Sequence, residues 1–423
     1  MDYFKELKKK IINKKATICV VGLGYVGRQI LRKFERSGYK TIGIDIDKNI
    51  IKKNIFSNKT TVTNNYKYIK FADVIIITLP TPLKKNLSPD LSFITNSIRK
   101  MDQYIRKGQL ISLESTTYPG TTEEIIGGFI SRKKLNLSKD FFLVYSPERI
   151  SPELKVKGVE AIKYGLHNTP KICAGYSKNC CILGKELYRH ITKKVVIASN
   201  LKVAETAKMI ENIFRSVNIA LVNELKMFLS KIDIDIHDAL NLAGTKPFGF
   251  TQFGPGPGYG GHCIPLDPFY LYWLAKKNNF DLKFIKTAGD INRRITSWIT
   301  RKIINFIKKN RIKLPDKKIL ILGVAYKRNI DDTRESPAFK IAEKLKKNGF
   351  DFEYSDPHVE KIKFNNKTKK SKKITTKLLK KYKIVLIVTD HHKFNYKLIS
   401  DNAEYIFDCR NSIKNRIKNY YKV

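Results

Sequence analysis

The sequence contains no hydrophobic run that is long enough to cross a membrane. Its longest apolar stretches, 74–78 and 319–325, are far shorter than the ~20 residues that a membrane-spanning helix needs. The N-terminal segment 1–15 is basic and has neither an apolar core nor a small-residue cleavage site. We therefore expect no signal peptide and no membrane partner.

Cysteine is scarce, and its spacing fits neither a metal site nor a disulfide framework. Two of the cysteines are adjacent, and none of them shows the spacing of metal ligands. The cysteines are Cys19, Cys173, Cys180, Cys181, Cys263 and Cys409. We expect no metal ion, and the simplest location for such a chain is a reducing cytoplasm.

Acidic residues are few, because 38 Asp and Glu stand against 82 Lys and Arg, for a formal charge of +44. Such an excess is typical of nucleic-acid-binding proteins. The lysines are spread over the whole chain without an RNA- or DNA-binding motif, and an AT-rich genome imposes the same composition. We favour this second interpretation and expect no nucleic acid partner, while a positive field would also recruit an anionic small substrate. The densest run, 361–383, has no acid and is expected to be a solvated surface segment.

A glycine-rich turn near the N-terminus separates a short β-rich run from an amphipathic helix. GLGYVG, at 22–27, has the G-x-G-x-x-G spacing of dinucleotide-binding folds. The first glycine allows the tight turn, the second lets a pyrophosphate approach the backbone, and the third lets helix and strand pack closely. The residues that we expect at the cofactor are Gly22, Gly24, Tyr25, Val26 and Gly27.

The strand after this helix ends at Asp45, eighteen residues beyond Gly27. An acid at this position binds the ribose hydroxyls of a dinucleotide. A carboxylate suits the 2′-hydroxyl of NAD and would repel the 2′-phosphate of NADP. The sequence therefore predicts NAD as the cofactor.

Three more β-rich runs, at 72–80, 108–116 and 141–147, alternate with helical stretches. This alternation predicts an α/β fold with a doubly wound parallel sheet. Ligands of such sheets bind at the carboxyl ends of the strands, where this chain has loops rich in hydroxyls and proline. Any one of these loops could also be ordinary turn chemistry. Their candidate site residues are Thr81, Thr116, Glu148 and Arg149.

A second unit, 317–360, repeats the order of strand, glycine turn, helix and strand, and its second strand ends at Asp356. The third glycine is absent and the loop 326–338 is longer, so we expect a second Rossmann-like domain adapted to another nucleotide. The runs 383–391 and 403–411 are predicted to be its last strands.

Two cations of the long loop, Lys327 and Arg334, are candidate contacts to phosphate or carboxylate, since arginine binds anions through two N–H groups. The alternative is a salt bridge to Asp331, Asp332 or Glu335. The sequence does not favour either interpretation.

Between the two units, 201–232 has helical periodicity and contains neither proline nor glycine. A helix of this length would span roughly 45–50 Å. We expect it to connect the two domains, and its apolar face predicts a homodimer. Lys208 and Asn212 are four residues apart and project from one face.

The fourteen residues PGPGYGGHCIPLDP, at 255–268, form a Gly/Pro loop around one thiol, Cys263, with Asp267 four residues later. The alternative to a reactive thiol is a buried inert one, but structural cysteines usually sit on packed elements.

Taken together and in this order, these motifs resemble the UDP-glucose/GDP-mannose dehydrogenase family, over about 16–412. The resemblance rests on GLGYVG, ESTTYPGTT, YSPER, AKMIENIFRSVNIALVNEL, GPGPGYGGHCIPLDPFYL and GVAYKRNIDDTRESPA. It implies an NAD-binding Rossmann domain at 1–195, a central helical dimerisation domain with the cysteine loop at 196–305, and a UDP-sugar-binding Rossmann-like domain at 306–423.

The resemblance also implies an NAD-dependent four-electron oxidation of C6 of a UDP-sugar, from alcohol to carboxylate. In the family pattern Cys263 is the nucleophile that forms a thiohemiacetal and then a thioester. Asp267 assists water or proton transfer, Lys208 and Asn212 steady the oxyanion, and Thr116 helps to position the reacting water. The implied substrate contacts are Glu148, Arg149, Lys208, Asn212, Gly260, Lys327 and Arg334.

One departure bears on the substrate. UDP-glucose dehydrogenases have a second Glu four residues after the Glu of their PE motif, where this chain has Pro152, with Glu153 next to it. The pattern looks most like the UDP-N-acetylglucosamine 6-dehydrogenases, so we expect UDP-N-acetylglucosamine, with UDP-glucose or UDP-N-acetylmannosamine as alternatives. It leaves open whether Glu148 or Glu153 takes part in proton transfer. The product of such an enzyme feeds polysaccharide biosynthesis.

Two rival interpretations are a two-electron hydroxyacid dehydrogenase and a basic nucleic-acid-binding protein with a relic Rossmann fold. The first would need neither Cys263 nor a second nucleotide domain. The second would not need the set of Lys208, Asn212, Cys263 and Asp267.

Overall fold

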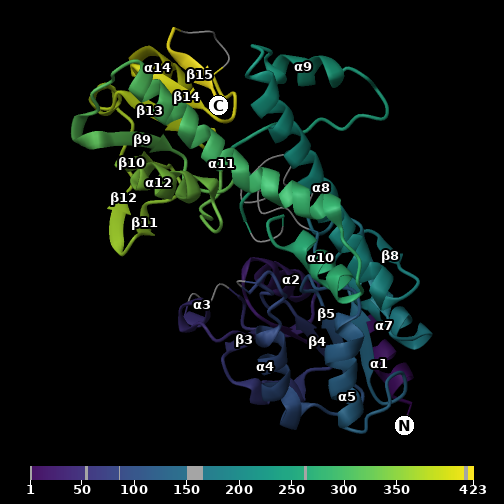
Figure 1. The fold of residues 1–423 in the computed structure, drawn as a ribbon. Helices are drawn as coiled ribbons and strands as arrows, with labels where there is room; N and C mark the ends of the chain where they lie inside the picture. The colour runs from purple at the N-terminus through teal and green to yellow at the C-terminus, as the bar shows by residue number, and fades with distance from the viewer. Residues whose placement is uncertain (1, 53–55, 85, 150–164, 262–263, 414–417) are drawn as a thin grey trace. The chain divides into compact units, whose positions relative to one another are not determined.

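The computed structural model describes residues 2–52, 56–84, 86–149, 165–261, 264–413 and 418–423. The chain forms two compact units: Met1–Glu211 with Trp273–Asn279, and Asn212–Tyr272 with Phe280–Val423 (Figure 1). The three-domain division expected from the sequence stays a prediction. No helix in the described parts of the chain is both long enough and apolar enough to span a membrane.

The first unit is built on an eight-stranded sheet with the order β3-β2-β1-β4-β5-β6-β7-β8. The first six of these strands are parallel, as predicted, whereas β7 pairs with β6 in the antiparallel direction. The strands are β1 (Thr17–Val21), β2 (Lys40–Ile44), β3 (Thr60–Thr63), β4 (Val74–Ile77), β5 (Leu110–Leu113), β6 (Phe142–Tyr145), β7 (Lys171–Gly175) and β8 (Val195–Ile197).

Helices cover both faces of this sheet. Successive residues of a strand point to opposite faces, so each buried strand contributes side chains to two cores. Ile18 and Val20 face a core made with α1, α2 and α7, and Cys19 and Val21 face a core made with α4, α5 and the start of α8. The helices are α1 (Tyr3–Ile12), α2 (Tyr25–Arg36), α3 (Lys48–Lys52), α4 (Ser92–Met101), α5 (Gly128–Arg132) and α7 (Lys178–Tyr188), with short helices η1 (Tyr66–Phe71), η2 (Asp102–Tyr104) and η3 (Thr122–Gly127). The prediction of a doubly wound sheet is confirmed.

The long helix predicted at 201–232 is α8 (Leu201–Leu229), and its residues belong to both units. It is continuous because the sequence gives it no proline or glycine, which are the residues that most disfavour a helix interior. Its first turns pack on the first unit through Leu201 and Ala204.

The second unit holds a five-stranded, fully parallel sheet with the order β10-β9-β13-β14-β15. Its strands are β9 (Lys318–Leu322), β10 (Asp351–Ser355), β13 (Ile384–Ile387), β14 (Tyr405–Asp408) and β15 (Tyr420–Lys422), and β11 (Lys361–Phe364) and β12 (Lys367–Lys370) form a separate antiparallel hairpin. Its helices are α9 (Ile236–Ala243), α10 (Asp267–Lys277, shared with the first unit), α11 (Lys283–Lys309), α12 (Pro337–Lys347), α13 (Thr376–Lys381) and α14 (Tyr396–Asn402), with the short η5 (Pro315–Lys317).

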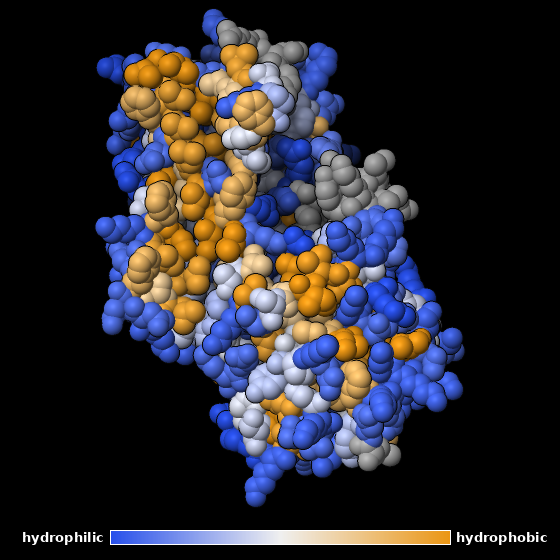
Figure 2. Space-filling view, turned by 90° about the vertical axis from the view of Figure 1, so that its right-hand side faces the viewer, coloured by the Kyte–Doolittle hydropathy of each residue, from blue (hydrophilic) through white to orange (hydrophobic). Residues whose placement is uncertain are grey.

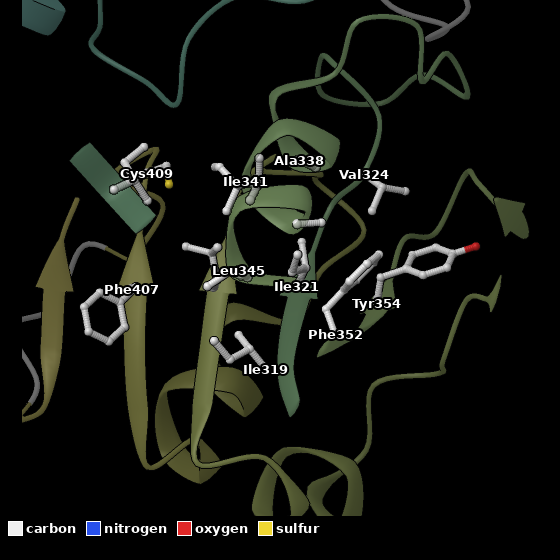
Figure 3. Close-up of a cluster of buried hydrophobic side chains, with 14 of the residues drawn as sticks. Ile319, Ile321, Val324, Ala338, Ile341, Leu345, Phe352, Tyr354, Phe407 and Cys409 are labelled. Atoms are coloured by element: carbon white, nitrogen blue, oxygen red, sulfur yellow. The ribbon is translucent and has the colours of Figure 1, made fainter. Parts of the chain in front are cut away.

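Both faces of this second sheet are also covered. Figure 3 shows Ile341 and Leu345 of α12 beside Ile319 and Ile321 of β9, in a core that α11 also joins. On the other face α13 and α14 pack against the sheet. The prediction of a second Rossmann-like domain is confirmed.

The run 403–411 is not the last strand, because β15 adds to the sheet beyond β14. The lysine-rich segment 361–383 is a solvated surface, as predicted: it forms the hairpin and α13, and nine of its eleven lysines are exposed.

Candidate active site

The glycine turn of the first unit has the geometry that the motif predicts. Gly22 has φ +92°, and a Cβ on Gly27 would lie 1.9 Å from the carbonyl oxygen of Gly22. A Cβ on Gly24 would meet nothing within 4 Å, and no side chain caps α2 at this residue. The turn is therefore closed by Gly22 and Gly27, and it leaves Gly24 and the helix N–H groups open to an anion.

Asp45 lies directly after β2, beside this turn. Its Oδ2 accepts a hydrogen bond from the N–H of Leu23 at 2.6 Å, and its Oδ1 accepts one from the N–H of Asp47 at 2.8 Å. A carboxylate can accept about four hydrogen bonds, so this half-buried group can still accept hydrogen bonds from ribose hydroxyls. Tyr25 and Val26 are the first two residues of α2 and are half-buried.

The carboxyl ends of β4 and β5 are joined by hydrogen bonds between loop residues. Thr81 Oγ1 donates to the carbonyl oxygen of Thr116 at 2.7 Å, and Ser115 Oγ donates to that of Leu79 at 2.7 Å. The structure therefore brings the predicted Thr81 and Thr116 together at one edge of the sheet.

At the same edge a buried ion cluster surrounds the predicted Glu148. Lys171 Nζ lies 2.7 Å from Glu114 Oε2 and 3.2 Å from Glu148 Oε2. Burial raises the pKa of the Glu114 carboxyl to about 7, although Lys171 opposes the shift. The sequence analysis did not identify either partner of Glu148. Glu114 is the first residue of the ESTTYPGTT motif, whereas Lys171 lies in no recognisable motif.

Arg149, a predicted substrate contact, has protein partners in the same unit. Its Nη2 forms a 2.7 Å ion pair with Glu211, and its Nη1 donates to the carbonyl oxygen of Pro170 at 2.9 Å. The structure thus places this guanidinium against α8. Pro152 and Glu153 lie outside the described residues.

The first turns of α8 carry Glu205 and Lys208 in the first unit. Glu205 accepts hydrogen bonds from the N–H groups of Gly120 and Thr122, at 2.5 and 2.9 Å, and so holds the loop that follows Thr116. Burial raises its pKa to about 7. Lys208 is 8% exposed, and among the described residues of this unit none forms an ion pair with it. Glu205 is a further residue that sequence reasoning missed.

In the second unit, Asn212 and Asp267 are in direct contact. Asn212 Nδ2 donates to Asp267 Oδ2 at 2.6 Å, and both side chains are buried. Asp267 is the first residue of α10, at the end of the Gly/Pro loop. Cys263, the thiol of this loop, lies outside the described residues.

The loop before Cys263 is fixed at several points of the second unit. The N–H of Gly256 donates to Asn223 Oδ1 at 2.9 Å, and Asn223 donates to Asn292 Oδ1 at 2.9 Å. The N–H of Gly261 donates to the carbonyl oxygen of Arg334 at 2.9 Å. A Cβ on Gly260 would lie 2.7 Å from Cβ of Tyr326, so only glycine fits there.

The loop after β9 therefore contacts the cysteine loop through its backbone. Lys327 is half-buried in this loop. Arg334 forms a bidentate ion pair with Asp332, with Nε–Oδ1 at 2.9 Å and Nη2–Oδ2 at 2.5 Å, which is the alternative that the sequence left open.

Asp356 occupies the place in the second unit that Asp45 occupies in the first, yet its surroundings differ. Its Oδ2 accepts hydrogen bonds from the N–H groups of Val324 and Ala325 and lies 3.0 Å from Nε2 of the buried His391. The protein itself thus fills this position, and we expect the second unit to bind its nucleotide through other groups.

Sequence models of three domains of the UDP-glucose/GDP-mannose dehydrogenase family match the chain: the NAD binding domain over 48–192, the central domain over 202–294 and the UDP binding domain over 320–415. The UDP-N-acetyl-D-mannosamine dehydrogenase of Pyrococcus horikoshii is 32% identical, with 94% of this chain and 96% of that protein covered. The UDP-N-acetyl-D-glucosamine 6-dehydrogenase of Pseudomonas aeruginosa is also 32% identical, with 82% and 84% covered. A solved structure of the Pyrococcus horikoshii enzyme superimposes with a TM-score of 0.84 at 31% identity, with 96% of this chain and 98% of that chain covered.

Proposed function

The chain belongs to the UDP-glucose/GDP-mannose dehydrogenase family, and on that premise we propose that it oxidises C6 of a UDP-N-acetylhexosamine to the uronic acid. It is an NAD-dependent oxidoreductase that acts on UDP-sugars. The observation that carries the finer proposal is the contact between Asn212 and Asp267, at the end of the loop that contains Cys263.

The residues of the first unit fit NAD. The open backbone at Gly24 and the uncapped N-terminus of α2 would receive the pyrophosphate, and Asp45 would accept the ribose hydroxyls. When bound, NAD accepts a hydride in each of the two oxidation steps.

The protein's own groups divide the remaining work. The Cys263 thiolate adds to the C6 aldehyde and gives a thiohemiacetal, whose oxidation leaves a thioester that water cleaves to the acid and the free thiol. Lys208, a buried ammonium without an ion pair among the described residues of its unit, supplies positive charge for the oxyanion. Asn212 donates to the oxyanion and orients Asp267, which assists the attacking water. Thr116 positions that water, and Glu148 lies at the same sheet edge.

The substrate's C2 substituent decides between close relatives. The sequence pattern around Pro152 favours an acetamide over the hydroxyl of UDP-glucose. Between the two acetamido epimers, the longer match to the mannosamine enzyme of Pyrococcus leads us to place UDP-N-acetylmannosamine before the UDP-N-acetylglucosamine expected from the sequence. UDP-N-acetylglucosamine is the second candidate because the Pseudomonas relative is equally identical.

We assign the UDP half to the second unit, through Lys327 and, once its pair with Asp332 opens, Arg334. The loop that holds them bonds directly to the cysteine loop at Gly261. Nucleotide binding at this loop would therefore be coupled to the cysteine loop through Gly261.

A homodimer is proposed from the exposed face of α8. Phe214, Leu221, Leu225 and Phe228 are 38–57% exposed and follow one another at intervals of seven, four and three residues. Figure 2 shows hydrophobic side chains gathered in a band on one side of the molecule. Apolar residues at intervals of three, four and seven on a helix suit packing against a second helix, here α8 of another copy of the chain. Leu221→Asp with Leu225→Asp would give a monomer by light scattering, and an unchanged mass would contradict the assignment.

One incubation tests the proposed substrate. The enzyme, NAD and an equimolar panel of UDP-N-acetylmannosamine, UDP-N-acetylglucosamine and UDP-glucose are combined, and uronic acids are separated by ion-mobility mass spectrometry. We expect an acetamido uronic acid at least tenfold ahead of glucuronic acid, since unpaired buried polar groups cost about 1–3 kcal/mol each. Faster formation of glucuronic acid would contradict the assignment of an acetamido sugar.

A further inference from the structure

Lys171 stands between two carboxylates at the active-site edge of the first sheet. Glu114 follows β5 and Glu148 follows β6, and these parallel strands are neighbours. Lys171 is the first residue of β7, which runs antiparallel to β6, so its side chain begins at the edge where the other two strands end. The side chains of Lys171, Glu114 and Glu148 are 3%, 0% and 9% exposed.

Every carboxylate oxygen in this cluster has a partner. Glu114 Oε1 accepts from the hydroxyl of Tyr188 at 2.7 Å, and Glu114 Oε2 accepts from Lys171 at 2.7 Å. Glu148 Oε2 accepts from Lys171 at 3.2 Å, and Glu148 Oε1 accepts from the N–H of Arg149 at 2.6 Å. The orientation of Glu148 therefore depends in part on its own turn and in part on Lys171.

We propose that Lys171 is a positioning residue, which holds the carboxylate of Glu148 along the sheet edge, and that Glu114 tunes this contact by competing for the same ammonium. The inference rests on the proposed function, which places Glu148 at the sheet edge where Thr116 positions the attacking water. One cation shared by two buried carboxylates stabilises each of them less than it would stabilise one alone.

The competition makes the cluster sensitive to pH. Burial raises the pKa of Glu114 to about 7, so this group is protonated below neutrality and then leaves the charge of Lys171 to Glu148. Lys171 itself stays charged, since the two carboxylates raise its pKa despite burial. The other titratable or charged groups that face the cluster are Tyr25, Arg149, Cys173, Tyr188 and, through Arg149, Glu211.

The test uses substitutions of the shared cation, Lys171, and of one of its two carboxylates, Glu114. Lys171→Met removes the cation, and we expect the acid limb of kcat/KM to move up by about one pH unit or more. Glu114→Gln keeps this side chain neutral at every pH, so we expect the acid limb below pH 7 to stay near that of the wild type and any further change of kcat/KM near pH 7 to disappear. Lys171→Arg keeps the charge and should hold the limb within a few tenths of a unit of the wild type. A merely structural role would lower kcat in all variants without moving the acid limb in Lys171→Met and without removing the change near pH 7 in Glu114→Gln.

Two further measurements keep the test decisive. NAD affinity, measured by fluorescence, reports whether each variant is folded, and if Lys171→Met does not fold, Glu114→Gln and Lys171→Arg still separate the outcomes. Infrared titration of the carboxylate band lost in Glu148→Gln gives the pKa of Glu148 without substrate. An unchanged acid limb and an unchanged Glu148 band in an active Lys171→Met, or a change of kcat/KM near pH 7 that persists in Glu114→Gln, would overturn the inference. Absence of NADH formation in the wild type with every UDP-sugar would overturn the proposed function instead.

Discussion

Asn212 and Asp267 are joined by a buried hydrogen bond of 2.6 Å, from the amide of α8 to the carboxylate that begins α10. The bond links the long helix to the end of the Gly/Pro loop. Because Asp267 Oδ2 accepts this bond, the bond holds the carboxylate at the start of α10 against α8.

Asn212→Asp would place a second carboxylate at this distance, where both cannot stay ionised. We expect the free energy of unfolding to fall by about 1–3 kcal/mol at pH 8. Stability should recover toward the wild-type value as the pH falls, because a shared proton replaces the lost N–H donor. Urea unfolding at pH 8 and pH 5 measures both effects. Asn218→Asp, on the same helix, is the matched control, and an equal loss at both pH values would refute the interpretation.

The glycine turn allows folding and cofactor binding to be separated. Gly27→Ala introduces a Cβ that would lie 1.9 Å from the carbonyl oxygen of Gly22, so we expect a stability loss of about 3 kcal/mol or more. Gly24→Ala introduces one with no neighbour within 4 Å. Its melting temperature should stay close to that of the wild type while its Kd for NAD rises at least tenfold. If Gly24→Ala binds NAD normally, the pyrophosphate does not approach this backbone.

Asp45 should set the choice of cofactor. Its carboxylate lies beside the turn and would repel the 2′-phosphate of NADP, so kcat/KM should favour NAD strongly. In Asp45→Ser the preference should shrink by at least tenfold. Asp47→Ser, two residues further on and exposed, is the control. Equal kcat/KM values for NAD and NADP in the wild type would show that Asp45 does not contact the ribose.

His237 on α9 should make the second unit sensitive to acid. Burial, with nearby Lys226, lowers the pKa of this imidazole to about 4. The unfolded chain takes up a proton near pH 6.5, so stability that is present above this pH is lost as the pH falls toward 4. Because the imidazole is only half-buried, solvent screening keeps the full effect on the free energy of unfolding below about 3 kcal/mol. Calorimetry at pH 7 and 4.5 should show a smaller difference in His237→Gln than in the wild type or in the exposed His392→Gln. An identical pH dependence in all three proteins would argue against this role.

Local patterns predicted the parts of the site that depend on local geometry. The positive φ of Gly22, the close packing at Gly27 and the place of Asp45 follow from spacing within one βαβ unit. Lys171 and Glu205 could not be predicted, because their partners are 57 and 83–85 residues away and nothing near them in the sequence marks the contact.

The second unit shows the same limit. The repeated order of strand, glycine turn and helix predicted its fold. The sequence could not show that the carboxylate of Asp356 is hydrogen-bonded to N–H groups of the protein and to His391. The pairing of Arg334 with Asp332, rather than with its other acidic neighbours, likewise depends on how the loop closes. Strand β15 has only three residues, which are too few for a β pattern to be visible in the sequence.

The number of NADH molecules formed per UDP-sugar tests the central claim most directly. With limiting UDP-N-acetylmannosamine or UDP-N-acetylglucosamine and excess NAD, absorbance at completion should give two NADH per sugar, together with one uronic acid. Cys263→Ser should form no uronic acid while it still binds NAD, and Cys181→Ser should behave as the wild type. One NADH per sugar in the wild type, or full acid formation in Cys263→Ser, would contradict the four-electron oxidation through a thioester.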